Sequence, residues 1–232
     1  MPTAQHFLLG AVPGLLWLIW FFRKDDHEPE PKRLVALAFL AGAAAAFLVV
    51  GLRPHVEGFV LDATGAGFSS LIDAFLVTAP LEEVVKTVAL LSAVGWSREW
   101  DEPLDGIVYG AAVALGFASV ENAYYAAASG GAGVIVARAF TSTLAHCAFT
   151  GGCGLILGLG RFRGGRVFAL ALPFGFLIAI LAHGTFDWLL LSGGRDLFAL
   201  LGWLPLMIVV LALELRWARS ISPRYHPRPA VP

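Results

Sequence analysis

The chain has 232 residues, of which 58% are hydrophobic and only 14% are charged. Its mean hydropathy of +0.75 lies outside the range of soluble globular domains, so the composition excludes that class. The formal net charge of −1 gives no reason to expect a nucleic-acid partner. The composition therefore favours a protein that resides in the lipid bilayer.

Apolar stretches long enough to cross a bilayer follow one another along the chain, separated by clusters of charged residues. They are continuously apolar and do not alternate, so they predict helices and not the strands of a transmembrane barrel. The predicted fold is all-α, a polytopic transmembrane helical bundle with about seven spans. The predicted spans are His6–Phe22, Leu34–Leu52, Leu71–Gly95, Leu104–Ala128, Gly133–Gly158, Val167–Ser192 and Leu197–Trp217.

The domain organisation predicted from this pattern is simple. Residues 1–219 form one integral-membrane domain, and residues 54–67 make an irregular or interfacial connection at the outer surface. Residues 220–232, with four prolines among the last ten, are predicted to be a disordered cytoplasmic tail. If the N-terminus is outside, 12 of the 16 Lys and Arg fall in inner segments. The positive-inside rule therefore predicts an N-out, C-in orientation.

Two glycine pairs predict where helices approach closely. Gly106 and Gly110 lie four residues apart in the fourth span, and Gly154 and Gly158 have the same spacing in the fifth. Small residues at this spacing let two membrane helices bring their backbones together. We expect tight packing of the bundle at these positions.

Charged residues interrupt the third span near its middle. Glu82 and Glu83 are adjacent, and Lys86 follows one helical turn after Glu82. Together with Glu121 in the fourth span, these four ionisable groups would cost about 10 kcal/mol if they faced lipid. Glu82 and Lys86 share one helix face, whereas Glu83 points about 100° away. An inert Glu82–Lys86 ion pair is one interpretation, but it leaves Glu83 without a partner.

Three further spans carry polar groups of the same kind. Glu121 and Asn122 are adjacent in the fourth span, and His146 lies in the fifth. In the sixth, His183 and Asp187 are four residues apart, so that the carboxylate can fix the imidazole tautomer. The predicted depths of these groups differ by less than about 8 Å along the membrane normal. We therefore expect them to converge on one buried cavity, although each alone could serve packing or helix stability.

In series, these residues resemble the motifs of the PrsW family of intramembrane proteases, which is similar to the wider CAAX-protease and Abi superfamily. The resemblance covers residues 71–192, which form the motif core. It implies an intramembrane endopeptidase of a prokaryotic plasma membrane that makes a site-1-type cut in a single-span anti-sigma factor. The motifs are Glu82-Glu83-Val-Val-Lys86, Asp105-Gly106-Ile-Val-Tyr-Gly110, Phe117-x-x-x-Glu121-Asn122, His146 within AHCAFTGGCG, and His183-Gly-Thr-Phe-Asp187.

Peptide hydrolysis requires an activated water, a stabilised oxyanion and a protonated leaving amine. We expect Glu82 to act as the general base, with Glu83 in support and His146 as its imidazole partner. His183, oriented by Asp187, would bind the oxyanion or the water. Lys86 would balance the acidic charge, Glu121 belongs to the same candidate catalytic set, and Asn122 would support it.

Two alternatives remain open at this point. Glu82, His146 and His183 could bind a catalytic zinc ion with an open position for water, although the chain lacks the H-E-x-x-H spacing. No cofactor is assigned, and zinc is the possible one. The same groups could instead form the relay of a proton-coupled transporter, for which broken helices and inverted repeats are expected. A non-catalytic scaffold would not need convergent ionisable groups.

Overall fold

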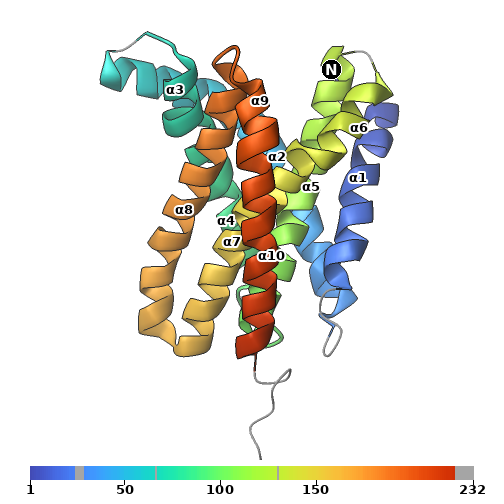
Figure 1. The fold of residues 1–232 in the computed structure, drawn as a ribbon, viewed down its shortest axis with the longest axis vertical. Coiled ribbons are helices and arrows are strands. Elements are labelled where there is room, and N and C mark those ends of the chain that lie inside the picture. The colour runs from blue at the N-terminus through green and yellow to red at the C-terminus, as the bar shows by residue number, and fades with distance from the viewer. Residues whose placement is uncertain (24–28, 66, 130, 223–232) are drawn as a thin grey trace, which may run out of the picture.

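The computed structural model describes residues 1–23, 29–65, 67–129 and 131–222. Within these residues the chain is a bundle of helices without strands, which confirms the predicted all-α class (Figure 1). The elements are α1 (Ala4–Phe22), α2 (Lys32–Thr64), α3 (Ser70–Ile72), the π-helical turn η1 (Asp73–Thr78), α4 (Ala79–Val94), α5 (Pro103–Ser129), α6 (Ala132–Phe140), α7 (Ser142–Arg163), α8 (Gly165–Leu191), α9 (Asp196–Phe198), the π-helical turn η2 (Ala199–Trp203) and α10 (Leu204–Ile221).

Six helical segments of the described chain are long and apolar enough to cross a membrane. They correspond to the predicted spans other than the third. The third predicted span is also helical, because α3, η1 and α4 continue one another over residues 70–94. It is less apolar than the others because it contains Glu82, Glu83 and Lys86.

Helix α5 is the centre of the bundle and is buried along most of its length. It packs against α1, α2 and α7. The predicted glycine faces meet here: a Cβ on Gly106 would collide with the backbone of Gly154, and a Cβ on Gly110 would approach Gly151 and Gly154. Since neither helix carries side chains at this crossing, α5 and α7 lie close enough to share the polar groups described below.

Three local predictions differ from the structure. Residues 54–64 are not irregular, because α2 continues through Pro54 to Thr64. The fifth predicted span is not one helix, because the backbone leaves the helical region at Thr141 and separates α6 from α7. α10 ends at Ile221, inside the predicted tail, and residues 223–232 lie outside the described residues.

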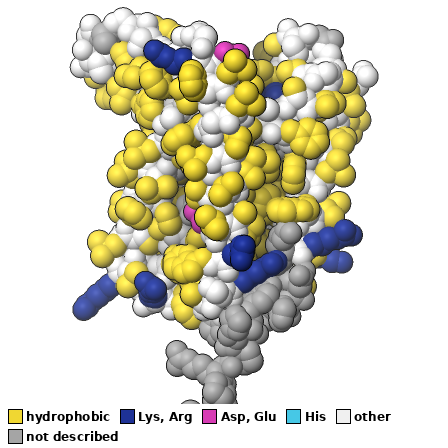
Figure 2. All heavy atoms as spheres, viewed as in Figure 1, with side chains coloured by type: hydrophobic (Ala, Val, Ile, Leu, Met, Phe, Trp, Pro, Cys, Tyr) yellow, Lys and Arg dark blue, Asp and Glu magenta, His cyan; other side chains and the backbone are white. Residues whose placement is uncertain are grey.

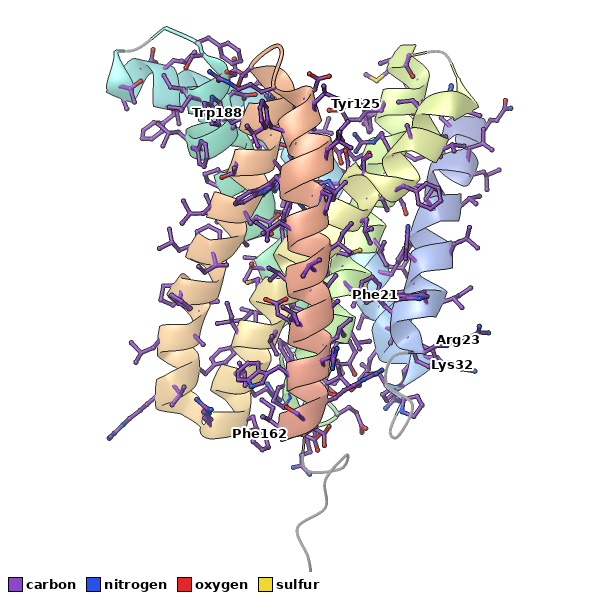
Figure 3. The ribbon with its side chains drawn as sticks, in the orientation of Figure 1. Phe21, Arg23, Lys32, Tyr125, Phe162 and Trp188 are labelled. Carbon is purple, nitrogen blue, oxygen red and sulfur yellow. The ribbon has the colours of Figure 1, made fainter. Side chains whose placement is uncertain are left out.

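The two ends of the bundle differ in charge. On the face shown in Figure 2, hydrophobic side chains cover the middle, and Lys and Arg gather mainly along the lower edge. Figure 3 places Arg23 and Lys32 at this lower end, and Tyr125 and Trp188 at the upper end. The N-terminus lies at the upper end (Figure 1). This separation of basic residues is the pattern on which the predicted N-out orientation rests.

Candidate active site

A widened helical turn leads into the Glu82–Glu83 pair. The backbone forms the π-helical turn η1 at residues 73–78, and α4 starts immediately afterwards with Pro80 in its first turn. Such π-helical turns are rare in proteins, and those that occur are frequently found at functional sites. Here the side chains that follow are Glu82 and Glu83, which are 7% and 0% exposed.

Lys86 is fully buried and contacts three other polar side chains of the site. Its Nζ donates hydrogen bonds to Glu82 Oε2 and Glu83 Oε1, each at 3.0 Å, and contacts His146 Nδ1 at 3.1 Å. An ammonium group only donates, so His146 Nδ1 must accept. The ring hydrogen of His146 is then on Nε2, where it reaches Glu121 Oε2 at 2.8 Å. Lys86 thus links His146 to Glu82.

Glu83 has several partners. Besides Lys86, it accepts a hydrogen bond from Thr150 at Oε2 (3.0 Å) and contacts His183 Nδ1 at Oε1 (2.9 Å). These contacts form because the long side chain of Lys86 reaches both i−4 and i−3, and because α7 and α8 supply the other partners. Glu83 is the most completely bonded carboxylate of the set.

His183 lies between two carboxylates. Its Nδ1 contacts Glu83, and its Nε2 lies 3.2 Å from Asp187 Oδ2 and 3.8 Å from Glu82 Oε2. The ring also stacks on Phe149, with centroids 5.3 Å apart and planes 20° from parallel. The i, i+4 spacing does bring Asp187 to the imidazole. Carboxylates thus lie beside both ring nitrogens, and Phe149 packs on one face of the ring.

Arg138 completes the site from α6 and was missed by the sequence analysis. It is 8% exposed and donates from Nη2 to Glu121 and from Nε to Asn122, each at 2.7 Å. Its guanidinium also lies 3.9 Å from the ring centroid of Tyr125. Arg138 lies within the predicted fifth span, Gly133–Gly158. The useful signal was its position within an apolar stretch, since an intramembrane arginine is as costly as an intramembrane glutamate.

The sequence analysis also missed a second arginine. Arg53, which lies beyond the predicted end of the second span, pairs with Asp73 Oδ1 at 2.7 Å. It also donates to Thr78 Oγ1 at 2.6 Å. Asp73 and Thr78 are the first and last residues of η1, so Arg53 ties α2 to the widened turn that precedes Glu82.

These groups surround one polar cavity of about 270 Å³. Of the predicted site residues, Glu83, Lys86 and Asn122 are not part of its wall and lie buried behind it. Tyr125, at the upper end in Figure 3, is part of the wall, so the cavity reaches towards the end of the bundle that faces away from Arg23 and Lys32. The predicted site residues that line it are Glu82, Glu121, His146, His183 and Asp187.

The comparison with known families supports the resemblance inferred from the motifs. The model of the family described as "PrsW family intramembrane metalloprotease" matches residues 30–213. The chain belongs to the PrsW family.

Curated relatives agree with this assignment. The chain is 37% identical over 188 residues to Protease PrsW of Geobacillus kaustophilus, covering 80% of each chain. It is 30% identical over 211 residues to Protease PrsW of Bacillus subtilis, covering 91% of this chain and 93% of the relative. Protease PrsW of Clostridioides difficile is 31% identical over 214 residues, covering 90% and 86%. No solved structure matches the chain.

PrsW membership and the apolar helices make the chain a multi-pass prokaryotic membrane protein. Membership also supports an intramembrane peptidase that acts on a membrane protein. Apart from the Asp105–Gly110 motif, the ionisable residues of the motif series that carried the resemblance meet at the cavity or lie directly behind it.

The same cavity offers a set of metal ligands in this PrsW family member. Glu82, His146 and His183 each present one ligand atom, and these atoms lie within 4.8 Å of one another. Two imidazoles and one carboxylate match the ligand set of catalytic zinc sites. Both rings are also held by a carboxylate at another nitrogen, Glu83 for His183 and Glu121 for His146, as in known zinc sites. The residues therefore fit zinc by type and number.

Proposed function

We propose that this PrsW family member hydrolyses a peptide bond of a single-span membrane protein with a water activated by Glu82. One observation carries the proposal. Of the two adjacent glutamates, Glu82 lines the polar cavity, beside His146 and His183, while Glu83 is buried behind it. A general base must reach the water that it deprotonates, and Glu82 meets this requirement.

The surrounding groups have complementary roles in this proposal. Both contacts of Glu82, to Lys86 and to His183, are made through Oε2. After Glu82 has accepted a proton from water, the same carboxyl group can deliver that proton to the leaving amine. His183, held between Glu83 and Asp187, can donate a hydrogen bond to the oxyanion of the tetrahedral intermediate. Lys86 stabilises the negative charge of both glutamates.

We favour catalysis by glutamate without metal because of Lys86. Its ammonium group already occupies the acceptor nitrogen of His146 and Oε2 of Glu82, two of the three possible zinc ligands. Zinc at His146 Nδ1 and the Lys86–His146 hydrogen bond exclude each other. The family resemblance further suggests an anti-sigma factor as the substrate, cut on its outer side, and the position of the cavity away from the basic end is consistent with this.

Zinc is the second candidate, supported by the three ligand atoms within 4.8 Å. Glu82, His146 and His183 would hold the ion, and it would supply Lewis-acid polarisation of the peptide carbonyl. In that case protein purified without chelator should contain about one equivalent of zinc, and its removal should abolish cleavage reversibly. Full activity of metal-free protein would exclude the zinc mechanism and leave the glutamate mechanism as the explanation.

The decisive experiment uses purified protein reconstituted in lipid vesicles with a panel of tagged single-span membrane proteins that includes anti-sigma factors. Glu82→Gln should lower cleavage at least about 100-fold, the usual scale for an acid–base group. Glu99→Gln, on an exposed loop residue, is the matched control and should cleave like the parent. Parent protein that is folded but cuts none of the panel, or a fully active Glu82→Gln variant, would contradict the proposal.

A further inference from the structure

A second cavity reaches the site from a different direction. It has a volume of about 180 Å³ and lies between α2 and α5. Arg53, Glu82 and Glu121 belong to the walls of both cavities, so Glu82 is accessible from two sides. The remaining wall of the second cavity consists of Ala46, Val49, Val50, Phe117, Val120 and Tyr124.

The two cavities differ in chemistry. The first is lined by imidazoles, carboxylates and arginines together with apolar side chains such as Phe149 and Leu190, whereas the second is apolar except at the end that it shares with the first. Two of its wall residues, Ala46 and Phe117, are 4% and 2% exposed and therefore lie inside the bundle. Val50 is 47% exposed on α2 and lies at its edge, on the surface that a membrane helix presents to lipid. The second cavity therefore connects the lipid-facing side of α2 with Glu82.

The size of the second cavity suggests its occupant. An apolar cavity of about 150 Å³ in a protein core is large enough to bind benzene. A cavity of 180 Å³ thus has room for one large apolar side chain, such as that of Leu or Phe. A side chain seated there would bring its own backbone to the shared end, next to Glu82 and Glu121.

A peptide fits this arrangement better than a lipid tail. The shared end presents two carboxylates and a guanidinium, and a peptide backbone carries both N–H donors and C=O acceptors for them. An acyl chain has neither, so it would leave these charged groups facing hydrocarbon.

We propose that the α2–α5 cavity is the subsite for an apolar side chain next to the scissile bond, reached from the bilayer, while the polar cavity delivers water to Glu82. This inference rests on the proposed protease function and names the substrate chemistry of the same site. A side chain that arrives from lipid gains little from the hydrophobic effect. The subsite therefore selects by fit and excludes charge.

The first test varies the substrate residue that flanks the scissile bond among Gly, Leu, Phe and Asp. The substrate is a single-span protein that the parent enzyme cuts in vesicles. The parent should prefer Leu or Phe by about 10-fold or more over Gly and Asp, the lower end for a shaped apolar pocket. Val50→Trp should fill the cavity and reverse the preference in favour of Gly. Leu48→Trp is the matched control, because Leu48 is 51% exposed on the same helix but is not in the cavity wall.

The second test detects the substrate in the cavity without relying on turnover. Both native cysteines, Cys147 and Cys153, are buried, so a thiol introduced at the edge by Val50→Cys can be cross-linked selectively. In the Glu82→Gln background, Val50→Cys should cross-link to a substrate cysteine beside the scissile bond. Leu48→Cys should not.

The outcomes of these tests distinguish a failure of the subsite proposal from a failure of the proposed protease function. If Val50→Trp and Leu48→Trp cut with the same side-chain preference as the parent, the protease stands and the subsite is wrong. Equal loss of all substrates in Val50→Trp, with no cross-link from Val50→Cys, would also overturn the subsite. A parent enzyme that cuts nothing would instead overturn the proposed function.

Discussion

The buried position of Lys86 gives a prediction that does not depend on knowing the substrate. Lys86→Met keeps a long side chain but removes the ammonium group that pairs with Glu82 and Glu83 at 3.0 Å. Lys86 and Glu83 are fully buried, so water cannot replace the lost partner of Glu83. Removing one partner of a buried pair costs about 3–5 kcal/mol. For a chain of this size, that corresponds to a fall in the midpoint of thermal unfolding of about 6–20 °C.

The assay is thermal unfolding of the purified protein in detergent. Lys86→Met should unfold well below the parent, and the double variant Lys86→Met/Glu83→Gln should recover part of the loss, because it removes one of the two uncompensated charges. The coupling between the two substitutions should be at least about 1 kcal/mol. Val88→Met is the matched control, since Val88 lies on the same helix and is 56% exposed.

Two results would refute this reasoning. If Lys86→Met unfolded at the same temperature as Val88→Met, the ammonium group would not stabilise the buried carboxylates. If the double variant were no more stable than Lys86→Met, the destabilisation would come from lost packing of the lysine side chain and not from uncompensated charge.

Three further predictions concern catalysis, packing and topology. Asp187→Asn should lower cleavage about 10-fold, less than loss of the histidine that it orients, as measured with a single-span substrate. Gly154→Leu should lower the free energy of unfolding by at least about 1–3 kcal/mol because α5 leaves no room for a side chain, whereas Gly51→Leu, with nothing within 4 Å, should not. A phosphatase reporter fused after Gly133 should be active and one fused after Arg166 inactive; the reverse would overturn the N-out prediction.

Composition and spacing were sufficient to predict the membrane helices and the positions of one close helix contact. Continuous apolar stretches have one stable solution in lipid, because the backbone must bond internally. The Gly106 and Gly154 motifs predicted tight packing at their own positions. In the structure these positions meet in the α5–α7 contact, since only glycine allows that backbone separation. Pro54 misled the prediction of α2 because proline is treated as a helix breaker, yet membrane helices tolerate it.

Contacts between helices were less predictable than the helices themselves. An angle on a helical wheel separated Glu83 from Lys86, but it ignored the reach of a lysine side chain and the donors Thr150 and His183 from other helices. The partners of Arg138 were not predicted, because a short break at Thr141 separates α6 from α7 and no local sequence pattern predicts how α6 is placed after it.

The charges around the polar cavity link the site to the metal question. His146 accepts a hydrogen bond from Lys86, so it adds no positive charge to the site. His183, between Glu83 and Asp187, is positioned to carry one additional proton. The described carboxylates at or behind the cavity outnumber the cations five to three: Asp73, Glu82, Glu83, Glu121 and Asp187 against Arg53, Lys86 and Arg138.

A buried excess of two negative charges is costly, and either bound protons or a divalent cation can remove it. These two solutions make opposite demands on Lys86. Protons leave the Lys86–His146 hydrogen bond in place, whereas zinc at His146 Nδ1 requires that this bond break. Substitution of Lys86 by methionine should therefore strengthen zinc binding if the metal uses this nitrogen, and it should leave the metal content unchanged if the site works with protons alone.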